Sequence, residues 1–420
     1  MENKRLLALG VMVYLLFFSW RFFVLRPQTF FPGTKLEIVS VLNSEPDVSG
    51  RTQRFEVAGL KIKTRRYPEY HYGDKLKILG VVKQYQTISF PIITKLEKTQ
   101  SSLFTTRLFH FRLKLEEIIN SNFPLPHSSL LIGMLLGIKN LPYEFSSDLK
   151  RSGLIHIVVA SGSNVTIVAS FFLYLSGMVG RRKALILSLL AIIFYTLMVG
   201  AEPPIVRAAL MGGLSYFAKI FGRQSYQVLT LILVGGLMLL YNPFYLFDLS
   251  FQLSFLATAG IILFAPLFLK FLRGTRRDLA SAIATTVSAQ LFVTPLIVSK
   301  FGQFSLFSLI TNILVYPLVE PIMILGFPYA VLGLINLRIS QILSYFLWLP
   351  LTYFIKAAHF FGNPDFSLLK IPRIPFLLFL PYYLFLLYLW IRFQRAATTP
   401  HARRHDRSSQ REVRKGDKNV

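Results

Sequence analysis

Cysteine is absent from the 420 residues, which excludes disulfide bonds, a thiolate metal site and a cysteine nucleophile. Acidic residues are scarce: 20 Asp and Glu stand against 46 Lys and Arg, for a formal net charge of +26. Part of that excess is typical of membrane proteins, whose cytoplasmic loops collect Lys and Arg. The remainder suits an anionic partner, either phospholipid or nucleic acid. A nucleotide-binding loop of the G-x-x-x-x-G-K-[ST] type is also missing, and the sequence leaves open the energy source of any transport.

Apolar runs, in contrast, are long and frequent. The chain is 53% hydrophobic with a mean hydropathy of +0.51. Runs near the ~20 residues needed to cross a bilayer recur from about residue 154 to residue 393. We expect a polytopic α-helical membrane protein of about 10 spans, some short or broken. Alternating these spans with the basic clusters places both termini in the cytoplasm.

The chain divides into five segments by composition. Residues 1–30 lack a small-residue cleavage site and predict a retained transmembrane anchor. Residues 34–100 alternate apolar with polar side chains and predict a small extracytoplasmic OB-like barrel. Residues 103–123 show a helical period and predict an amphipathic helix at the membrane interface. Residues 124–393 hold the membrane domain, and residues 394–420 form a polar, basic tail expected to be disordered.

The predicted barrel interleaves cations with aromatic residues. Cations can track a phosphate backbone while aromatic faces stack bases, which is how single strands are held without sequence preference. The alternative is an ordinary basic sheet surface. The candidate DNA-binding residues are Lys61, Lys63, Arg65, Arg66, Tyr70, Tyr72, Lys75 and Lys77.

The segment 152–168, "SGLIHIVVASGSNVTIV", is the first polar stretch among the predicted spans. Its strongly polar or helix-weakening residues are His156, Ser161, Gly162, Ser163 and Asn164. Such residues favour a broken helix whose free backbone groups line a cavity. The alternative is close helix packing through small residues. An intramembrane hydrolase using Ser161 and His156 is a third possibility, although no acidic residue lies between them to orient the imidazole.

Further polar residues fall on other predicted spans, where they are costly and default to functional candidates. Arg207 follows Glu202 by just over one turn, so we expect Glu202 or a water-filled path to accommodate the guanidinium. Asp248 suits a helix cap and shares a face with Gln252. The full set of predicted channel-lining residues is His156, Ser161, Gly162, Ser163, Asn164, Glu202, Arg207, Asp248, Gln252, Ser254, Gln290 and Asn312. No cofactor, metal site or catalytic residue is predicted.

The order of these motifs resembles the ComEC-type competence family, which passes single-stranded DNA through the bacterial inner membrane during natural transformation. The resemblance covers roughly residues 35–340. It rests on "SGLIHIVVASGSNVTIV", "YTLMVGAEPPIVRAALM", "NPFYLFDLSFQLSFLATAGI" and "AQLFVTPLIVSKFGQFSLFSLITNILVYPL". Two departures matter: Asn164 stands where the family segment has a second histidine, and no "HxHxDH" motif of the family's metallo-β-lactamase-like domain occurs.

The resemblance implies a channel, without the nuclease, that translocates single-stranded DNA into the cytoplasm. Its implied partners are single-stranded DNA, the lipid bilayer and other DNA-uptake proteins such as a receptor and a cytoplasmic motor. The sequence leaves the oligomeric state open. A membrane hydrolase and a transporter of a smaller anion remain the alternative functions at this point.

Overall fold

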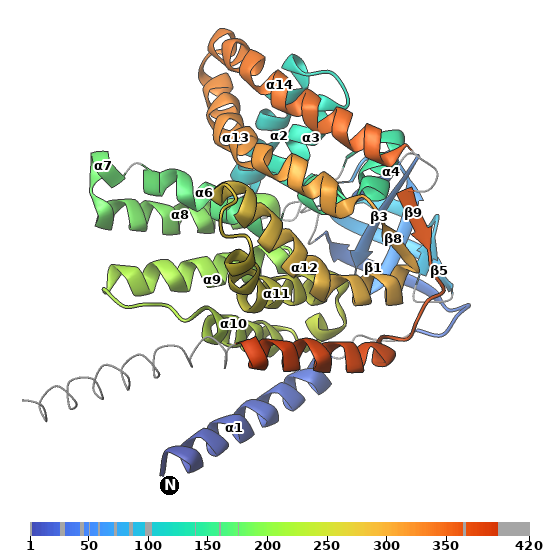
Figure 1. Ribbon diagram of the computed structural model, residues 1–420. Helices are drawn as coiled ribbons and strands as arrows, with labels where there is room; N and C mark the ends of the chain where they lie inside the picture. The colour runs from blue at the N-terminus through green and yellow to red at the C-terminus, as the bar shows by residue number, and fades with distance from the viewer. Residues whose placement is uncertain are drawn as a thin grey trace, which may run out of the picture. The chain divides into compact units, whose positions relative to one another are not determined.

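The alternating residues between 35 and 95 form a curled half-barrel sheet in the computed structural model (Figure 1). The strand order is β1-β5-β6-β4-β3-β2, with β7 also paired to β5. β4 and β6 are parallel, and the other pairs are antiparallel. Alternate residues of the strands fill one core that includes Phe55, Leu60 and Ile62. The strands are β1 (Lys35–Val41), β2 (Asp47–Ser49), β3 (Thr52–Val57), β4 (Leu60–Arg65), β5 (Lys75–Lys83), β6 (Thr87–Ser89) and β7 (Ile92–Lys95).

The structure describes residues 2–25, 30–42, 46–49, 51–57, 59–70, 74–83, 87–96, 103–138, 140–158, 161–174, 176–363 and 367–393. The predicted disordered tail, residues 394–420, and the candidate residue Tyr72 lie outside these ranges. The chain forms two compact units: residues 1–255 with 305–368, and residues 256–304 with 369–420.

The first unit holds the half-barrel and most of the helices. Its core lies where α2, α3, α6, α8, α13 and α14 pack together, and α13 and α14 run side by side (Figure 1). α11 begins in this unit and continues into the second. The helices are α1 (Glu2–Val24), α2 (Leu103–Asn122), α3 (His127–Leu136), α4 (Tyr143–Ser152), α5 (Ile155–Val158), α6 (Gly162–Tyr174), α7 (Ser176–Val179), α8 (Arg181–Val199), α9 (Pro203–Ile220), α10 (Gln227–Tyr241), the 3-10 helix η2 (Pro243–Phe247), α11 (Leu249–Phe271), α13 (Ser308–Ile335) and α14 (Leu337–Gly362).

The second unit contains the rest of α11, α12 (Arg277–Phe301) and the helix Phe376–Phe393, which opens with η4 (Phe376–Phe379). α11 and α12 approach closely, because a Cβ on Gly260 would lie 2.4 Å from the carbonyl oxygen of Ser288. Tyr382 and Tyr383 donate to the carbonyls of Leu291 and Phe292, which ties the last helix to α12. The short strands β8 (Gln303–Ser305) and β9 (Leu368–Lys370) lie where the chain passes between the units.

Five helices among the described residues are long and apolar enough to cross a membrane: α8, α11, α12, α13 and Phe376–Phe393. α3, α6, α10 and the segment Gly10–Val24 are apolar but shorter. The structure therefore supports a mainly helical, multi-pass membrane protein, whereas the number of spans stays a prediction.

The predicted interfacial helix, α2, packs into the bundle through its C-terminal half. Leu115, Ile118 and Ile119 are buried in the core of the first unit. Tyr329 of α13 donates to the carbonyl of Ile118, and Asn122 donates to the hydroxyl of Tyr329. Protein thus covers the C-terminal half of the apolar stripe, and an interfacial position for the rest of α2 stays a prediction.

Candidate functional site

The helix predicted to break within the segment 152–168 is interrupted there. α5 ends at Val158, and α6 begins at Gly162. Small and hydroxylated residues mark the restart. The Ser161 and Ser163 hydroxyls lie 2.6 Å apart, and both lie within hydrogen-bond distance of Asn164 Oδ1. These side-chain hydrogen bonds compete with helical backbone bonds, which favours a helix terminus at this point.

Asn164 joins this terminus to the neighbouring helix α3. Its side chain is 0% exposed and donates from Nδ2 to the carbonyl of Met134, at 3.0 Å. The Tyr195 hydroxyl of α8 donates to the same carbonyl at 3.5 Å. A buried amide with both of its polar atoms hydrogen-bonded holds helices in register. Asn164 therefore has the packing role that the sequence left as an alternative to lining a path.

Gly162 is where α6 meets Arg207 of α9. A Cβ on Gly162 would lie 2.5 Å from Arg207 Nη2 and 3.1 Å from the Ala208 Cβ. The Arg207 Nε donates to the Ser254 hydroxyl of α11 at 2.7 Å. The three helices therefore meet at one point, which we call the Arg207 junction: Gly162, Arg207 and Ser254. Only glycine leaves room for the guanidinium there.

The electrostatics of the Arg207 junction favour an anion. Arginine stays protonated in proteins, and the side chain of Arg207 is half-buried. The described contacts of its guanidinium are uncharged: the Ser254 hydroxyl and the Met211 sulfur, the latter at 3.6 Å from Nη1. Gly162 is the first residue of the 13-residue helix α6, and a helix N-terminus adds partial positive charge. The positive field of the junction is therefore available to a negatively charged ligand.

Glu202, predicted as a partner of Arg207, lies at the N-cap position of α9 and makes no side-chain capping bond there. Ser254 supplies the charge-assisted hydrogen bond that we expected from Glu202. Asp248 and Gln252 fix the turn before α11. Asp248 Oδ1 accepts from the Phe251 N–H at 2.7 Å, and Gln252 Nε2 donates to the Leu246 carbonyl at 2.7 Å. Both side chains therefore have local roles, so the structure gives no reason to place them on a path.

His156, Asn312 and Gln290 are not brought to the Arg207 junction by any described contact. His156 is an exposed residue of α5. Ser161 directs its hydroxyl to Ser163 and Asn164, so the described bonds give no support to a Ser161–His156 pair. Asn312 is 6% exposed, and its Oδ1 has no hydrogen-bond partner among the residues described. Gln290 belongs to α12 of the second unit.

The half-barrel places its predicted cations on two surfaces. Lys61, Lys63 and Arg65 alternate with buried residues along β4, so they share its outer face. Arg54 of β3 is paired with Lys63 and extends this face. We call these four residues the β4 face. Arg54 was not among the predicted DNA-binding residues, although the alternation within β3 was sufficient to place it on the outer face of the strand.

Lys75 and Lys77 lie instead on β5 where it pairs with β1. Lys77 forms an ion pair with Glu37 of β1 at 2.5 Å, which offsets part of its charge. The predicted cationic surface is therefore divided. Glu56 is paired with Lys61 on the outer side of the strands, and the β4 face still carries the larger net positive charge.

Tyr70 was wrongly predicted to stack bases on the barrel surface. It is 5% exposed, and its ring packs at 6.0 Å from that of Phe55 in the barrel core. Burial raises the pKa of its hydroxyl above the ordinary value, with the negative charge of Asp74 adding to the effect. An apolar core takes aromatic rings readily, and the sequence pattern alone did not distinguish this ring from an exposed one.

Two other rings are exposed beside predicted cations. Phe90 is 55% exposed, and the Lys63 ammonium lies 5.9 Å from its ring centre. Its backbone φ is +52°, a left-handed conformation that is uncommon for a bulky residue. Tyr67 is 70% exposed beneath the Arg66 guanidinium, which lies 5.5 Å from the ring centre. These rings supply the aromatic surface that Tyr70 does not.

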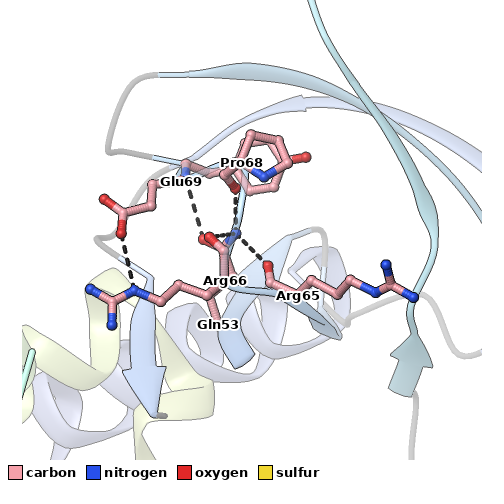
Figure 2. Close-up of polar contacts among 6 residues, drawn as sticks. Gln53, Arg65, Arg66, Pro68 and Glu69 are labelled. Carbon is pink, nitrogen blue, oxygen red and sulfur yellow. Dashed lines mark hydrogen bonds and ion pairs between the residues drawn. The ribbon is translucent and has the colours of Figure 1, made fainter. Parts of the chain in front are cut away.

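Gln53 holds the segment that carries Arg66 and Tyr67 (Figure 2). This side chain is 0% exposed, and its Nε2 lies 2.7–3.0 Å from the carbonyls of Arg65, Arg66 and Pro68. Its Oε1 accepts from the Tyr70 N–H. Figure 2 also shows Arg66 paired with Glu69, at 3.1 Å. One buried amide thus orders the turn beyond β4 and leaves its side chains at the surface.

No group of three or more His, Asp or Glu side chains suited to a metal ion occurs in the described part of the chain.

A family model described as "Competence protein" matches residues 134–396, a range that includes the Arg207 junction. Among curated proteins, ComE operon protein 3 of Bacillus subtilis (strain 168) is 27% identical over 290 residues, which cover 68% of this chain and 35% of that protein. An uncharacterized protein of Aquifex aeolicus (strain VF5) is 32% identical over 202 residues, 47% of this chain and 44% of that protein. The chain therefore matches less than half of the length of either relative, and no solved structure matches it.

Proposed function

This chain belongs to the competence protein family, and we propose that it conducts single-stranded DNA across the bacterial inner membrane into the cytoplasm. Family membership and the similarity to ComE operon protein 3 support a role in DNA uptake. A non-enzymatic role is part of the proposal, and the bonding of Ser161, whose hydroxyl contacts Ser163 and Asn164, is consistent with it. Both termini are proposed to be cytoplasmic.

The observation that carries the proposal is the Arg207 junction. A polyanion crossing an apolar layer needs fixed positive potential on its route, because moving an isolated charge into a low-dielectric region is costly. Arg207 supplies this charge between three helices, beside the N-terminus of α6. Helix ends and backbone gaps that face a cavity are the usual way for membrane proteins to bind ions and substrates at depth. We therefore assign Arg207 to transient contact with DNA phosphates.

The half-barrel is proposed to receive the strand first. Its strand order, with β4 and β6 parallel, supports the OB-like assignment. The β4 face offers four cations, and Phe90 and Tyr67 offer exposed rings. A positively charged groove with aromatic faces binds single strands without sequence preference. Lys61, Lys63, Arg65 and Arg66 stay in the proposed contact set, and Phe90 takes the place of Tyr70.

Other proteins of the uptake apparatus complete the proposed cycle. The sequence has no nucleotide-binding loop, and a cytoplasmic motor is proposed to drive translocation. A surface receptor is proposed to deliver the strand. The lipid bilayer is the remaining partner, contacting the apolar helices.

The test replaces Arg207 with Ala in a naturally transformable host that depends on this chain for DNA uptake. Transformation frequency and DNA bound outside the cell are measured together, with Lys219→Ala on the same helix as the matched control. Loss of a charge-assisted contact worth ~1.5–3 kcal/mol corresponds to a decrease of about tenfold or more in transformation. External DNA binding should stay unchanged. If the Arg207→Ala protein is present at wild-type amounts and transformation is normal, DNA does not depend on the Arg207 junction for its passage.

A further inference from the structure

The N-terminal helix α1 makes specific contacts with the end of α10. Tyr14 donates from its hydroxyl to the carbonyl of Gly236, at 3.3 Å. One turn before the end of α1, Arg21 donates from Nε to the carbonyl of Leu240 and from Nη2 to that of Tyr241. The ring of Phe22 stacks on Phe244 of η2, with centroids 5.0 Å apart. A helix that served only to anchor the chain in lipid would not need directed polar contacts of this kind.

Arg21 has a chemical reason to be at this position. The last carbonyls of α10 have no helical N–H partner, and an arginine near a helix C-terminus can satisfy them while its charge meets the negative end of the helix dipole. Its planar guanidinium reaches two consecutive carbonyls at once. This contact explains a cation inside an otherwise apolar run, which the sequence alone did not explain.

A second face of α10, about 100° round the helix from the first, packs against α11. A Cβ on Gly235 would lie 3.0 Å from the ring of Phe255, whereas the neighbouring Gly236 faces Tyr14 of α1. Two adjacent glycines therefore let α10 approach a helix on each side. Because both faces are in close contact, a displacement of α10 on the α1 side has to be taken up at α11.

The core between α10 and α11 is also the support of the Arg207 junction. Val234 and Met238 of α10 are buried there with Phe251 of α11. Phe251 and Phe255 flank Ser254 along α11, and Met211 of α9, which packs against the same core, contacts Arg207 directly. The chain of contacts from Arg21 to Ser254 is therefore continuous and lies within the first unit.

We infer that α1 is a fixed part of the conduit wall, and that Arg21 is a positioning residue that holds Ser254 against Arg207 through α10. The functional part of this inference rests on the proposed function, whereas the geometric part does not. Since β1 of the half-barrel begins at Lys35, soon after α1 ends at Val24, the same helix links the strand-receiving domain to the junction.

The absence of cysteine makes a direct geometric test possible, because only introduced thiols can react. Arg207→Cys with Ser254→Cys gives a pair whose cross-linking by a short bifunctional thiol reagent reports the distance between α9 and α11. The yield is measured on the full chain in lipid vesicles, with Arg21 intact and with Arg21→Ala. Trp20→Ala is the matched control, since its exposed ring neighbours Arg21 on the same helix.

We expect Arg21→Ala to lower the cross-linking yield severalfold, while Trp20→Ala leaves it unchanged. In the cysteine-free chain, Arg21→Ala should lower transformation as well. Equal yields with and without Arg21 overturn the inference. If Arg21→Ala does not accumulate, Gly236→Leu serves instead, because the added side chain displaces Tyr14 and leaves Arg21 in place. An unchanged yield in that variant contradicts the inference equally. A reduced yield with normal transformation contradicts the proposed function and leaves the packing inference standing.

Discussion

The β4 face of the half-barrel and the Arg207 junction both present positive charge, but they are built in different ways. The β4 face places Arg54, Lys61, Lys63 and Arg65 on outward positions of two strands, where Arg54 is paired with Lys63. The junction has one cation, fixed by Ser254 and seated against Gly162. A surface with several solvated charges attracts a polyanion from a distance, and salt weakens this attraction. A single packed cation acts only at contact and depends on its neighbours.

This difference predicts how each region tolerates change. Substitutions on the β4 face should produce small, salt-dependent losses of affinity for DNA, because each removes one of several solvated charges. Substitutions at the junction should produce large losses of transformation even when they add only one atom, because a closely packed interior cannot relieve a steric overlap.

The largest effect is expected from Gly162→Ala. The added Cβ would lie 2.5 Å from Arg207 Nη2, so the guanidinium has to leave its position. Overpacking of this kind costs ~1–3 kcal/mol and corresponds to a loss of up to about 100-fold in transformation. Gly213→Ala on α9 is the control, since its Cβ would meet only an ordinary 3.5 Å contact with Leu189. Equal losses in both variants would mean that an added methyl group lowers transformation wherever these helices pack, and that its overlap with Arg207 is not the cause.

A smaller effect is expected from Phe90→Leu on the barrel, which removes the ring but keeps an apolar side chain. Base stacking on an aromatic residue is worth ~1–3 kcal/mol, so single-stranded DNA should bind the full chain about tenfold more weakly. Fluorescence anisotropy with a labelled oligothymidine measures this affinity. Phe31→Leu is the control, because Phe31 is 84% exposed elsewhere in the first unit. An affinity that does not change in Phe90→Leu would exclude Phe90 as a stacking surface.

The smallest effect is expected from replacing cations of the barrel, and it distinguishes the β4 face from the surface that carries Lys75 and Lys77. Replacing Lys61, Lys63 and Arg65 together with Gln should lower the slope of log affinity against log salt by about 2, at ~0.7 per lost phosphate contact on a single strand. Replacing Lys75 and Lys77 with Gln should change it less, because Lys77 is already paired with Glu37. A larger change for the second pair than for the first three would reverse the assignment of the β4 face.

The sequence predicted the features that depend on local pattern. Period-two alternation placed the barrel strands and the outward direction of Lys61, Lys63 and Arg65. Small and hydroxylated residues placed the helix interruption before Gly162. The strand alternation and the helix interruption both depend on residues that are neighbours along the chain, so a single sequence is enough to predict them.

Features that depend on a partner far along the chain were not predicted. Arg207 was expected to need either Glu202, five residues away, or a water-filled path, and its bond to Ser254, 47 residues away, was not expected. Local bonds were predicted in part: Asp248 was expected to cap a helix, and its Oδ1 accepts from the Phe251 N–H at the start of α11, whereas the bond from Gln252 to the Leu246 carbonyl was not expected. Tyr70 was misplaced for a related reason: strand alternation does not say whether a ring after the strand turns toward the core.

The central claim is that DNA passes the N-terminus of α6 beside Arg207. Ser163→Cys in the cysteine-free chain places a thiol next to the junction, and Leu190→Cys places one on the exposed apolar side of α8. A DNA strand that carries thiol-reactive groups along its length and a bulky end that stops it during transfer is supplied to competent cells. The account predicts cross-linking of the strand to residue 163 and not to residue 190. Arrested DNA that reacts with neither thiol, or with both equally, would contradict it.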